Sequence, residues 1–503
     1  MALICATVTA ATTADLRRQR DAVANADLIE LRLDTVSDPD AAGALAGRRA
    51  PVIVTCRSAA EGGHFKGSEE ERKRILLEAL ALGADYVDVE MQSGFDDVIR
   101  QRSGRGVIVS LHDFDGIPAD LPSRISAMRA TGAQVVKIAV TPKRLADCNT
   151  LLAINGQHGK HGELVVLGLG PFGSTTRILP DRFGSAWTYA GALQEIGQLS
   201  VNALVNAYNF RSIDASTEIY GIVGGSVAHS VSPAMHNAAF RALQFNGAYV
   251  PLPAVDAADF VEFGKAFKIN GASVTMPHKV TLFDQLDEVY SVARRIGAIN
   301  TVRVENGRWI GGNTDAAGFL EPLRERVPVR GLQASILGAG GAARAVAVGL
   351  ASAGCSVRIH ARDDAKAKHV AMQTGSEVGP WPPKPGSWDL LVNCTPIGMY
   401  PRADETPIDR QQLTGRYVYD IVYNPTQTRL MREAAEMGCQ TIGGLEMLVA
   451  QAQQQFLLWT GRRPDAAVMR GAAARALKER GWRDHSDSAP ATVSALPQER
   501  LLR

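Results

Sequence analysis

Eight short apolar runs recur through the first 213 residues of this 503-residue chain, and their number and spacing constrain its fold more than any other feature. They are Leu3–Val8, Asp27–Leu33, Val52–Cys56, Tyr86–Glu90, Val107–Leu111, Val135–Val140, Leu164–Leu169 and Ser185–Ala190. Amphipathic stretches such as Glu69–Leu82 and Leu121–Thr131 separate most of them. Eight strand–helix units in about 210 residues predict a (β/α)8 barrel. A doubly wound open sheet is the alternative, but these runs have no glycine-rich phosphate turn, which favours the closed barrel.

The sixth run, Val135–Val140, has one lysine, Lys137, in an otherwise continuous apolar stretch. Such a strand is typical of a sheet buried on both faces, where an unpaired ammonium group is costly. A buried lysine therefore either forms a structural ion pair or serves a reaction. Schiff-base formation with a carbonyl substrate is the most common such reaction.

Charged side chains recur at the ends of the predicted strands, where barrel enzymes place their active sites. They are Glu30, Arg32, Arg57, Asp88, Glu90, His112 and Lys137, from five consecutive strands. Each alone is explained by a packing ion pair or a satisfied polar residue, but together they predict an active site. In it, Lys137 would condense with a ketone, His112 would carry protons, and the arginines would hold a carboxylate.

Ordered motifs run through this half of the chain. They are Glu30-Leu-Arg32-Leu-Asp34, Thr55-Cys-Arg57-Ser-Ala-Ala-Glu61-Gly-Gly, Ser110-Leu-His112-Asp113-Phe, Lys137-Ile-Ala-Val, Arg177, Phe183-Gly-Ser and Gly197-Gln198. In this order they resemble type I 3-dehydroquinate dehydratase over essentially the whole half.

The resemblance implies that Lys137 forms an imine with the C3 ketone of 3-dehydroquinate. It also implies that His112 removes the C2 proton and assists loss of water, and that Glu61 supports His112. The substrate-binding residues it implies are Glu30, Arg32, Arg57, Arg177 and Gln198. Gln194 stands where the family often has serine, so we expect a lid contact to the substrate to differ.

The second half starts after a short linker near residue 215, and its clearest feature is a strand–turn–helix pattern. It reads Ala334-Ser-Ile-Leu-Gly338-Ala-Gly340-Gly341-Ala-Ala-Arg344. This context presents backbone N–H groups and a helix N-terminus to a pyrophosphate, although an ordinary tight turn is the alternative. The next strand ends at Arg362, which suits the 2′-phosphate of NADP. Asp363 and Asp364 follow and would repel that phosphate if they faced it.

Further polar motifs lie between residue 219 and about residue 325. They are His229-Ser230-Val-Ser232-Pro233, Ser273-Val-Thr275-Met-Pro-His-Lys279 and Gly311-Gly-Asn-Thr-Asp315. Singly, each is typical of a turn or a helix cap. Further motifs of the second half are Gly297-Ala-Ile-Asn300-Thr, the glycine turn, Asn393-Cys-Thr395-Pro and Gly444-Leu-Glu-Met-Leu-Val-Ala-Gln451. The whole set resembles shikimate dehydrogenase across the second half.

This second resemblance implies a catalytic pair, Lys279 and Asp315, with Lys279 passing a proton to the carbonyl oxygen as NADPH gives hydride to the carbon. The implied substrate-binding residues are Ser230 and Ser232 for the carboxylate and Thr275, Asn300, Tyr423 and Gln451 for the ring hydroxyls. The implied cofactor-binding residues are Gly338, Ala339, Gly340, Gly341, Ala342, Arg362, Thr395 and Gly444. Ser273 stands where many relatives carry asparagine.

The charge and composition of the chain limit the classes of molecule that it is expected to bind. The chain has 54 Lys and Arg against 52 Asp and Glu, so no global field favours nucleic acid or an anionic membrane. Its six cysteines are scattered without metal-ligand spacing, so we expect reduced thiols and no metal. No apolar run approaches the roughly 18 residues of a membrane helix, and the N-terminus resembles a first strand rather than a signal peptide. We expect a cytoplasmic protein that acts on small molecules, either as a monomer or as a dimer.

The expected architecture is α/β. A (β/α)8 TIM barrel at 1–214 is followed by a substrate-binding lobe at 218–325, an NADP-binding Rossmann-like lobe with closing helices at 326–482, and a disordered tail at 483–503. The expected function is dehydration of 3-dehydroquinate to 3-dehydroshikimate, then NADPH-dependent reduction to shikimate. One alternative is a quinate/shikimate dehydrogenase fusion acting catabolically with NAD. The other is a non-catalytic metabolite sensor, which would need no imine lysine.

Overall fold

The computed structural model describes residues 1–158 and 163–479, and the tail expected at 483–503 lies outside the described residues. The chain groups into two compact units. Of the described residues, the first unit contains those within 1–318 and 449–473, and the second contains 319–448 and 474–479. The chain passes between the units within three helices, which are α12 (Asp315–Arg324), α16 (Gly444–Thr460) and α17 (Ala466–Glu479).

The first unit begins with eight parallel strands in the order β7-β6-β5-β4-β3-β2-β1-β8. They are β1 (Leu3–Val8), β2 (Leu28–Arg32), β3 (Val52–Thr55), β4 (Tyr86–Glu90), β5 (Val107–Asp113), β6 (Val135–Val140), β7 (Leu164–Gly168) and β8 (Trp187–Gly191). At the seam between β7 and β8, the Ala186 N–H donates to Leu164 O at 2.8 Å. The barrel is therefore nearly closed, and the expected (β/α)8 fold is confirmed.

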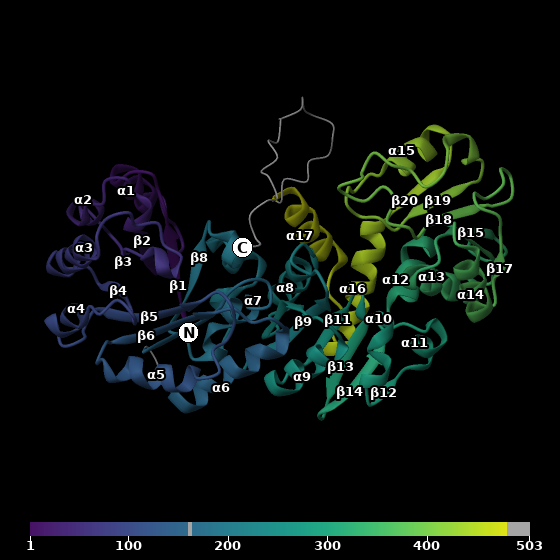
Figure 1. Ribbon diagram of the computed structural model, residues 1–503. Helices are drawn as coiled ribbons and strands as arrows, with labels where there is room; N and C mark the ends of the chain where they lie inside the picture. The colour runs from purple at the N-terminus through teal and green to yellow at the C-terminus, as the bar shows by residue number, and fades with distance from the viewer. Residues whose placement is uncertain (159–162, 480–503) are drawn as a thin grey trace. The chain divides into compact units, whose positions relative to one another are not determined.

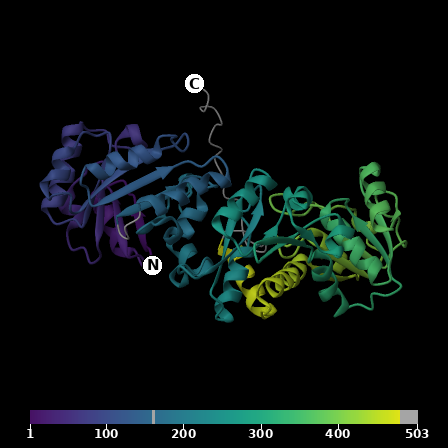
Figure 2. The same cartoon turned by 90° about the horizontal axis from the view of Figure 1, so that it is seen from below.

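Helices cover the outside of these strands (Figures 1 and 2). They are α1 (Thr13–Ala22), α2 (Ala41–Leu45), α3 (Glu69–Ala81), α4 (Asp96–Gln101), α5 (Leu121–Ala130), α6 (Cys148–His158) and α7 (Ser174–Ile178). A capping box starts α3, since Ser68 Oγ accepts from Glu71 N and the Glu71 carboxylate accepts from Ser68 N. Strand β8 begins two residues after its expected start at Ser185, because the Ser185 hydroxyl bonds the Val166 backbone instead.

The rest of the first unit is a lobe built on a six-stranded sheet of order β10-β9-β11-β13-β14-β12. The strands are β9 (Glu218–Gly224), β10 (Gly247–Pro253), β11 (Gly271–Val274), β12 (Glu288–Val289), β13 (Thr301–Glu305) and β14 (Arg308–Gly312). Its helices are α8 (Ser232–Ala242), α9 (Ala257–Phe267), α10 (His278–Thr281) and α11 (Ser291–Ile296). The chain enters α8 at Ser232 because Pro233 fits a first helical turn, where its missing N–H costs nothing.

A buried carboxylate joins this lobe to the barrel. Asp259 on α9 is fully buried and accepts hydrogen bonds from the backbone N–H groups of Leu145 (3.1 Å) and Ala146 (2.7 Å). Both lie in a single 3-10 turn, Leu145–Asp147, which follows the strand that carries Lys137. The barrel and the lobe are thus held by specific bonds as well as by apolar packing.

The second unit contains a fully parallel sheet of order β17-β16-β15-β18-β19-β20. Its strands are β15 (Gln333–Leu337), β16 (Ser356–His360), β17 (Glu377–Val378), β18 (Leu390–Asn393), β19 (Tyr417–Asp420) and β20 (Gln440–Gly443). Its own helices are α13 (Gly341–Ser352), α14 (Asp364–Thr374) and α15 (Arg429–Glu436). This order is the Rossmann-like arrangement expected from the glycine turn. In the described part of the chain, no helix is long and apolar enough to cross a membrane.

Candidate active sites

A cavity of about 110 Å³ opens at the carboxyl ends of the barrel strands. Parallel strands end at one rim, so residues far apart in sequence meet there. All the site residues expected in the first half line this cavity, namely Glu30, Arg32, Arg57, Glu61, His112, Lys137, Arg177 and Gln198. Gln194 is exposed and does not line it, although its neighbours Leu193 and Glu195 do.

Lys137 is 4% exposed and lies among carboxylates. Its Nζ is 2.8 Å from Asp88 Oδ2 and 3.8 Å from Glu30 Oε1. The same Nζ lies 4.3 Å from the centre of the Tyr189 ring, in cation–π geometry. The lysine is therefore buried, paired and open to the cavity, which is the setting that a Schiff-base lysine requires.

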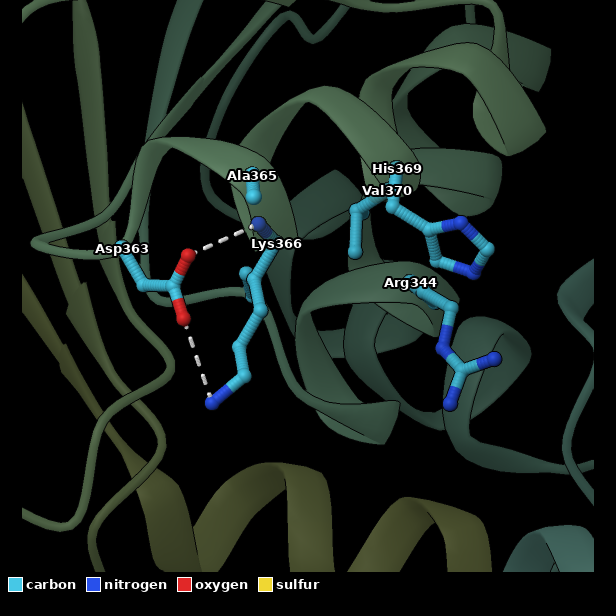
Figure 3. A pocket seen from close by; sticks show the side chains of 7 residues that line it. Arg344, Asp363, Ala365, Lys366, His369 and Val370 are labelled. Atoms are coloured by element: carbon cyan, nitrogen blue, oxygen red, sulfur yellow. Dashed lines mark hydrogen bonds and ion pairs between the residues drawn. The ribbon is translucent and has the colours of Figure 1, made fainter.

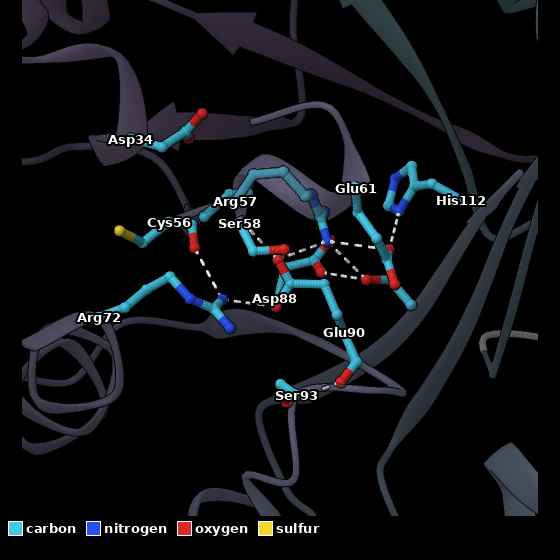
Figure 4. A network of polar contacts seen from close by, with 12 residues as sticks. Asp34, Cys56, Arg57, Ser58, Glu61, Arg72, Asp88, Glu90, Ser93 and His112 are labelled. Atoms are coloured by element: carbon cyan, nitrogen blue, oxygen red, sulfur yellow. Dashed lines mark hydrogen bonds and ion pairs between the residues drawn. The ribbon is translucent and has the colours of Figure 1, made fainter. Parts of the chain in front are cut away.

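Arg57 is the centre of a polar network (Figure 4). Its guanidinium is 2.9 Å from Asp88 and 3.3 Å from Glu90, and it donates to the Ser110 hydroxyl at 2.8 Å. Burial opposes the charge on Arg57, but the carboxylates of Asp88 and Glu90 outweigh it, so the pKa of Arg57 is raised. Burial likewise works against ionised Asp88, yet Arg57 and Lys137 hold the pKa of its carboxyl well below the usual range.

His112 on β5 lies beside Glu61, and its Nδ1 is 2.8 Å from Glu61 Oε2. Burial raises the pKa of Glu61 to about 7, with Arg57 opposing the shift. Burial also lowers the pKa of His112, and the nearby cations Arg57 and Lys137 add to that effect. The imidazole is thus neutral at neutral pH, as a proton acceptor must be.

Arg177 differs from the other arginines at the cavity. It is 1% exposed and donates only to carbonyl oxygens, of Gly168 at 3.1 Å and Ile196 at 2.9 Å. No carboxylate in the described residues lies within ion-pair distance of it, whereas Arg32 pairs with Asp34 at 2.8 Å. Burial without a counter-ion lowers the pKa of Arg177 to about 10. A substrate carboxylate would supply the missing negative charge.

A second lysine–aspartate pair lies in the other lobe of the first unit. Lys279 Nζ on α10 is 2.6 Å from Asp315 Oδ2, at the start of α12. Asn300 Nδ2 donates to the other carboxylate oxygen of Asp315 at 2.7 Å and is itself buried. These three expected residues therefore meet in one cluster.

The Ser273 hydroxyl belongs to a buried chain of hydrogen bonds that leads to this cluster. It accepts from the Tyr249 hydroxyl at 2.6 Å and donates to Gln455 Oε1 at 2.7 Å. Gln455 Nε2 in turn donates to Asn300 O at 3.0 Å. The sequence patterns did not single out Tyr249 or Gln455, because a buried tyrosine and a helical glutamine carry no local signal.

The remaining expected residues of the dehydrogenase motifs lie in separate elements. Ser230 Oγ accepts from Ser232 N at 3.1 Å at the start of α8, and Ser232 is buried. Partly exposed side chains are found at Thr275, just before α10, and at Gln451 on α16, both in the first unit. In the second unit, Tyr423 follows β19 and is also partly exposed.

The glycine turn between β15 and α13 has the shape of a phosphate-binding loop. Gly338 has φ +109°, and a Cβ there would lie 3.1 Å from Cys394 O, so only glycine fits well. A Cβ at Gly340 would meet nothing within 4 Å, and no side chain caps the first turn of α13. Open space therefore faces uncapped N–H groups at a helix N-terminus, which fits a pyrophosphate.

A pocket of about 390 Å³ lies beside this turn (Figure 3). Its lining residues are Ala339, Arg344, Asp363, Ala365, Lys366, His369 and Val370. Three of them, Arg344, Lys366 and His369, have basic side chains that suit a phosphate. Asp363 forms an ion pair with Lys366 at 3.3 Å. Arg362 is exposed and is not among the lining residues.

Three other expected cofactor residues lie close to the turn in sequence or in the sheet. Gly341 and Ala342 form the first turn of α13, and Thr395 follows β18, the strand that pairs with β15. The Thr395 hydroxyl donates to Asn393 at 2.7 Å. At Gly444, a Cβ would lie 2.2 Å from Ile421 O, so the packing of two backbone segments explains this glycine.

Family models match most of the chain. That of type I 3-dehydroquinase matches residues 4–215, that of the shikimate dehydrogenase substrate binding domain matches 222–302, and that of the shikimate 5′-dehydrogenase C-terminal domain matches 444–474. A relative from Arabidopsis thaliana is named bifunctional 3-dehydroquinate dehydratase/shikimate dehydrogenase, chloroplastic. It is 35% identical over 476 residues, which cover 87% of this chain and 78% of the relative. The chain belongs to this bifunctional dehydratase/dehydrogenase family.

The dehydrogenase half of this bifunctional chain also matches single-function relatives. The shikimate dehydrogenase (NADP(+)) of Carboxydothermus hydrogenoformans is 41% identical over 273 residues, covering 52% of this chain and 98% of the relative. A crystal structure of a shikimate dehydrogenase in complex with NADP+ is 36% identical with a TM-score of 0.50, covering 52% of this chain and 96% of that one. The family membership expected from the motifs is confirmed.

Proposed function

We propose that this chain dehydrates 3-dehydroquinate to 3-dehydroshikimate in its barrel and reduces 3-dehydroshikimate to shikimate in its second half. The observation that carries the first activity is that two buried cationic side chains, those of Lys137 and Arg177, line the same cavity. Lys137 is placed to attack a ketone, and Arg177 lacks a counter-ion that a substrate carboxylate provides. A keto acid has both of the required groups, a ketone that reacts with Lys137 and a carboxylate that pairs with Arg177.

In the dehydration, the amine of Lys137 adds to the C3 ketone and releases water to form an imine. The imine acidifies the C2 proton, which neutral His112 takes while the carboxylate of Glu61 accepts its Nδ1–H. His112 then delivers a proton to the departing C1 hydroxyl, and water hydrolyses the product imine. Arg177 and Gln198 hold the substrate; Gln198 Oε1 is buried without a hydrogen-bond partner in the described residues.

Borohydride trapping tests the first activity. Reduction in the presence of 3-dehydroquinate should attach the substrate skeleton to the peptide that contains Lys137, and Lys137→Ala should show no adduct and no dehydration. The same variant should reduce supplied 3-dehydroshikimate at close to the wild-type rate, because its second catalytic cluster is intact. An unmodified Lys137 peptide in the active wild-type protein would exclude the imine mechanism.

In the reduction, NADPH would supply the hydride, and the open glycine turn at Gly338 and Gly340 would hold its phosphates. Lys279, held by Asp315 at 2.6 Å, gives its proton to the substrate oxygen as that oxygen gains negative charge. Asn300 fixes the Asp315 carboxylate at the required orientation. Ser230 and Ser232 hold the carboxylate, while Thr275 and Gln451 pair with ring hydroxyls, so analogues that lack these hydroxyls are rejected.

Rates with NADPH and NADH on 3-dehydroshikimate, and with quinate as an alternative substrate, test the second activity. We expect NADPH and 3-dehydroshikimate to be preferred, and Lys279→Ala to abolish reduction while leaving dehydration intact. A preference for NAD and quinate would favour the catabolic alternative. Absence of both activities in the folded protein would favour the metabolite sensor.

We assign the dehydratase to residues 1–214, the substrate-binding lobe to 218–325 and the NADP-binding lobe to 326–482. The compact units divide the chain at other points, within α12, α16 and α17, because each of these helices contributes residues to both units. All six cysteines are free, which fits a reducing compartment, and we propose the cytoplasm.

A further inference from the structure

Arg72 is a buried cation that the dehydration scheme does not use. It lies on α3, on the outside of the barrel strands, and is 1% exposed. Its Nη1 donates to Glu90 Oε2 at 2.6 Å and to Cys56 O at 3.0 Å. The Phe95 ring lies under its guanidinium, 4.6 Å from ring centre to Cζ. Arg72 does not line the cavity, so it cannot touch the substrate.

Alternating charges connect Arg72 to Lys137, and Figure 4 shows the part of this series that contains Arg72, Glu90, Arg57 and Asp88. The Glu90 carboxylate binds Arg72 through one oxygen and lies 3.3 Å from Arg57 through the other. Arg57 is 2.9 Å from Asp88, and the same Asp88 oxygen is 2.8 Å from Lys137 Nζ. All five residues are less than 5% exposed, so water screens these contacts weakly.

The contacts are also directional. Ser110 donates to Asp88 at 2.6 Å and accepts from Arg57 at 2.8 Å, which fixes the two side chains against each other. The backbone N–H of Ser58 donates to Glu90 at 2.9 Å. Glu90 therefore has a single well-defined place, in which its charge is shared between two guanidinium groups.

We infer that Arg72 is a positioning residue for Lys137, acting through Glu90, Arg57 and Asp88. The inference rests on the proposed imine mechanism. Without Arg72, the charge of Glu90 is balanced by Arg57 alone, which is drawn toward Glu90 and away from Asp88. Asp88 then has Lys137 as its main partner, and the ammonium is held more tightly and in a different place. The amine is released less readily to attack the ketone.

Arg72→Met tests this inference, because methionine keeps an apolar stem against Phe95 and removes the charge. We expect kcat for dehydration to fall about tenfold or more, since small misplacements of reacting groups cost up to about a hundredfold. The KM should stay within about twofold, because Arg177 and Gln198 are untouched. The rate of borohydride trapping at Lys137 should fall with kcat, and Arg72→Lys should recover part of both.

Arg20→Met is the matched control. Arg20 is another buried arginine on a barrel helix, 2% exposed, and it donates to the carbonyls of Ala44 and Ala46 with no link to Lys137. This variant should lose stability but keep kcat, and reduction of 3-dehydroshikimate should be unchanged in all three variants at a temperature where they are folded.

Two results would overturn the inference. One is an unchanged kcat and trapping rate in folded Arg72→Met, and the other is an equal loss of kcat in Arg20→Met. Failure of the underlying mechanism gives a different result, because the wild-type protein would then form no adduct at Lys137 at all.

Discussion

At the scale of single residues, burial sets the protonation states on which the proposed chemistry depends. Glu61 and His112 face each other across 2.8 Å, and burial raises the pKa of Glu61 to about 7 while it lowers the pKa of His112. Below pH 7 the protonated Glu61 donates to Nδ1, which leaves the proton of the neutral ring on Nε2. Above pH 7 the carboxylate accepts Nδ1–H, and Nε2 becomes the base.

The pH dependence of dehydration should therefore report Glu61. We expect kcat/KM to rise with pH up to about 7 and then to level off, because the working tautomer of His112 forms as Glu61 ionises. Glu61→Gln should lower the plateau and remove the step near pH 7, because the amide does not titrate. Steady-state rates from about pH 5 to about pH 9 measure this. A step that survives in Glu61→Gln belongs to another group.

At the scale of elements, parallel strands and helix starts place the chemistry. Charged residues at the ends of β2, β3, β5 and β6 line one cavity, and Asp88 on β4 contacts two of them, Arg57 and Lys137, as the strand spacing predicts. At the start of α14, Asp363 caps the helix, accepting from Lys366 N at 3.1 Å, and also lines the pocket beside the glycine turn. The cap stabilises the helix, while its carboxylate repels a 2′-phosphate.

Asp363→Ser separates these two roles, because serine also caps a helix but carries no charge. We expect the ratio of kcat/KM with NADPH to that with NADH to rise about fivefold to tenfold, because the carboxylate that repels the 2′-phosphate is gone. Asp364→Ser is the control, since Asp364 is the next residue on α14 and does not line the pocket. Equal changes in the two variants would mean that the helix, rather than the pocket carboxylate, sets the preference.

At the scale of the whole molecule, the first unit joins the barrel to part of the dehydrogenase half. Asp259 accepts from three buried or partly buried backbone N–H groups, those of Leu145, Ala146 and Val255. Arg144 and Glu262 form a neighbouring ion pair whose side chains are exposed to solvent. Buried, directional bonds of this kind contribute far more than exposed ion pairs do.

Asp259→Ala should therefore destabilise the first unit by about 3 kcal/mol, because it leaves three donors unpaired. Both activities should then be lost at a lower temperature than in the wild-type protein, while kcat at low temperature is unchanged. Glu262→Ala should change the free energy of unfolding by less than about 1 kcal/mol. Residual activity after heating, measured for each of the two reactions, compares the stability of the two variants. Loss of heat resistance in only one activity would show that the two halves unfold separately.

The sequence by itself determined the features that depend on residues close together in the chain, namely the strands, the helices and the glycine turn. Strand and helix periods fix the eight runs of the barrel, and the glycine turn between a strand and a helix marks the nucleotide-binding sheet, because each depends on neighbours within a few residues. Charged residues at strand ends identified Lys137 and His112, since the fold gathers such ends at one rim.

Only the tertiary structure decided how these charges pair. Lys137 and Asp88 are 49 residues apart, and nothing local shows that they touch at 2.8 Å. Sequence patterns treat Arg57 and Arg177 alike, yet carboxylates surround the first and none in the described residues reaches the second. Arg72 resembles an ordinary helical partner of Glu69, three residues earlier, until the fold brings Glu90 to its other side. Electrostatic roles depend on distance and burial in three dimensions, and neither is encoded by a residue's neighbours along the chain.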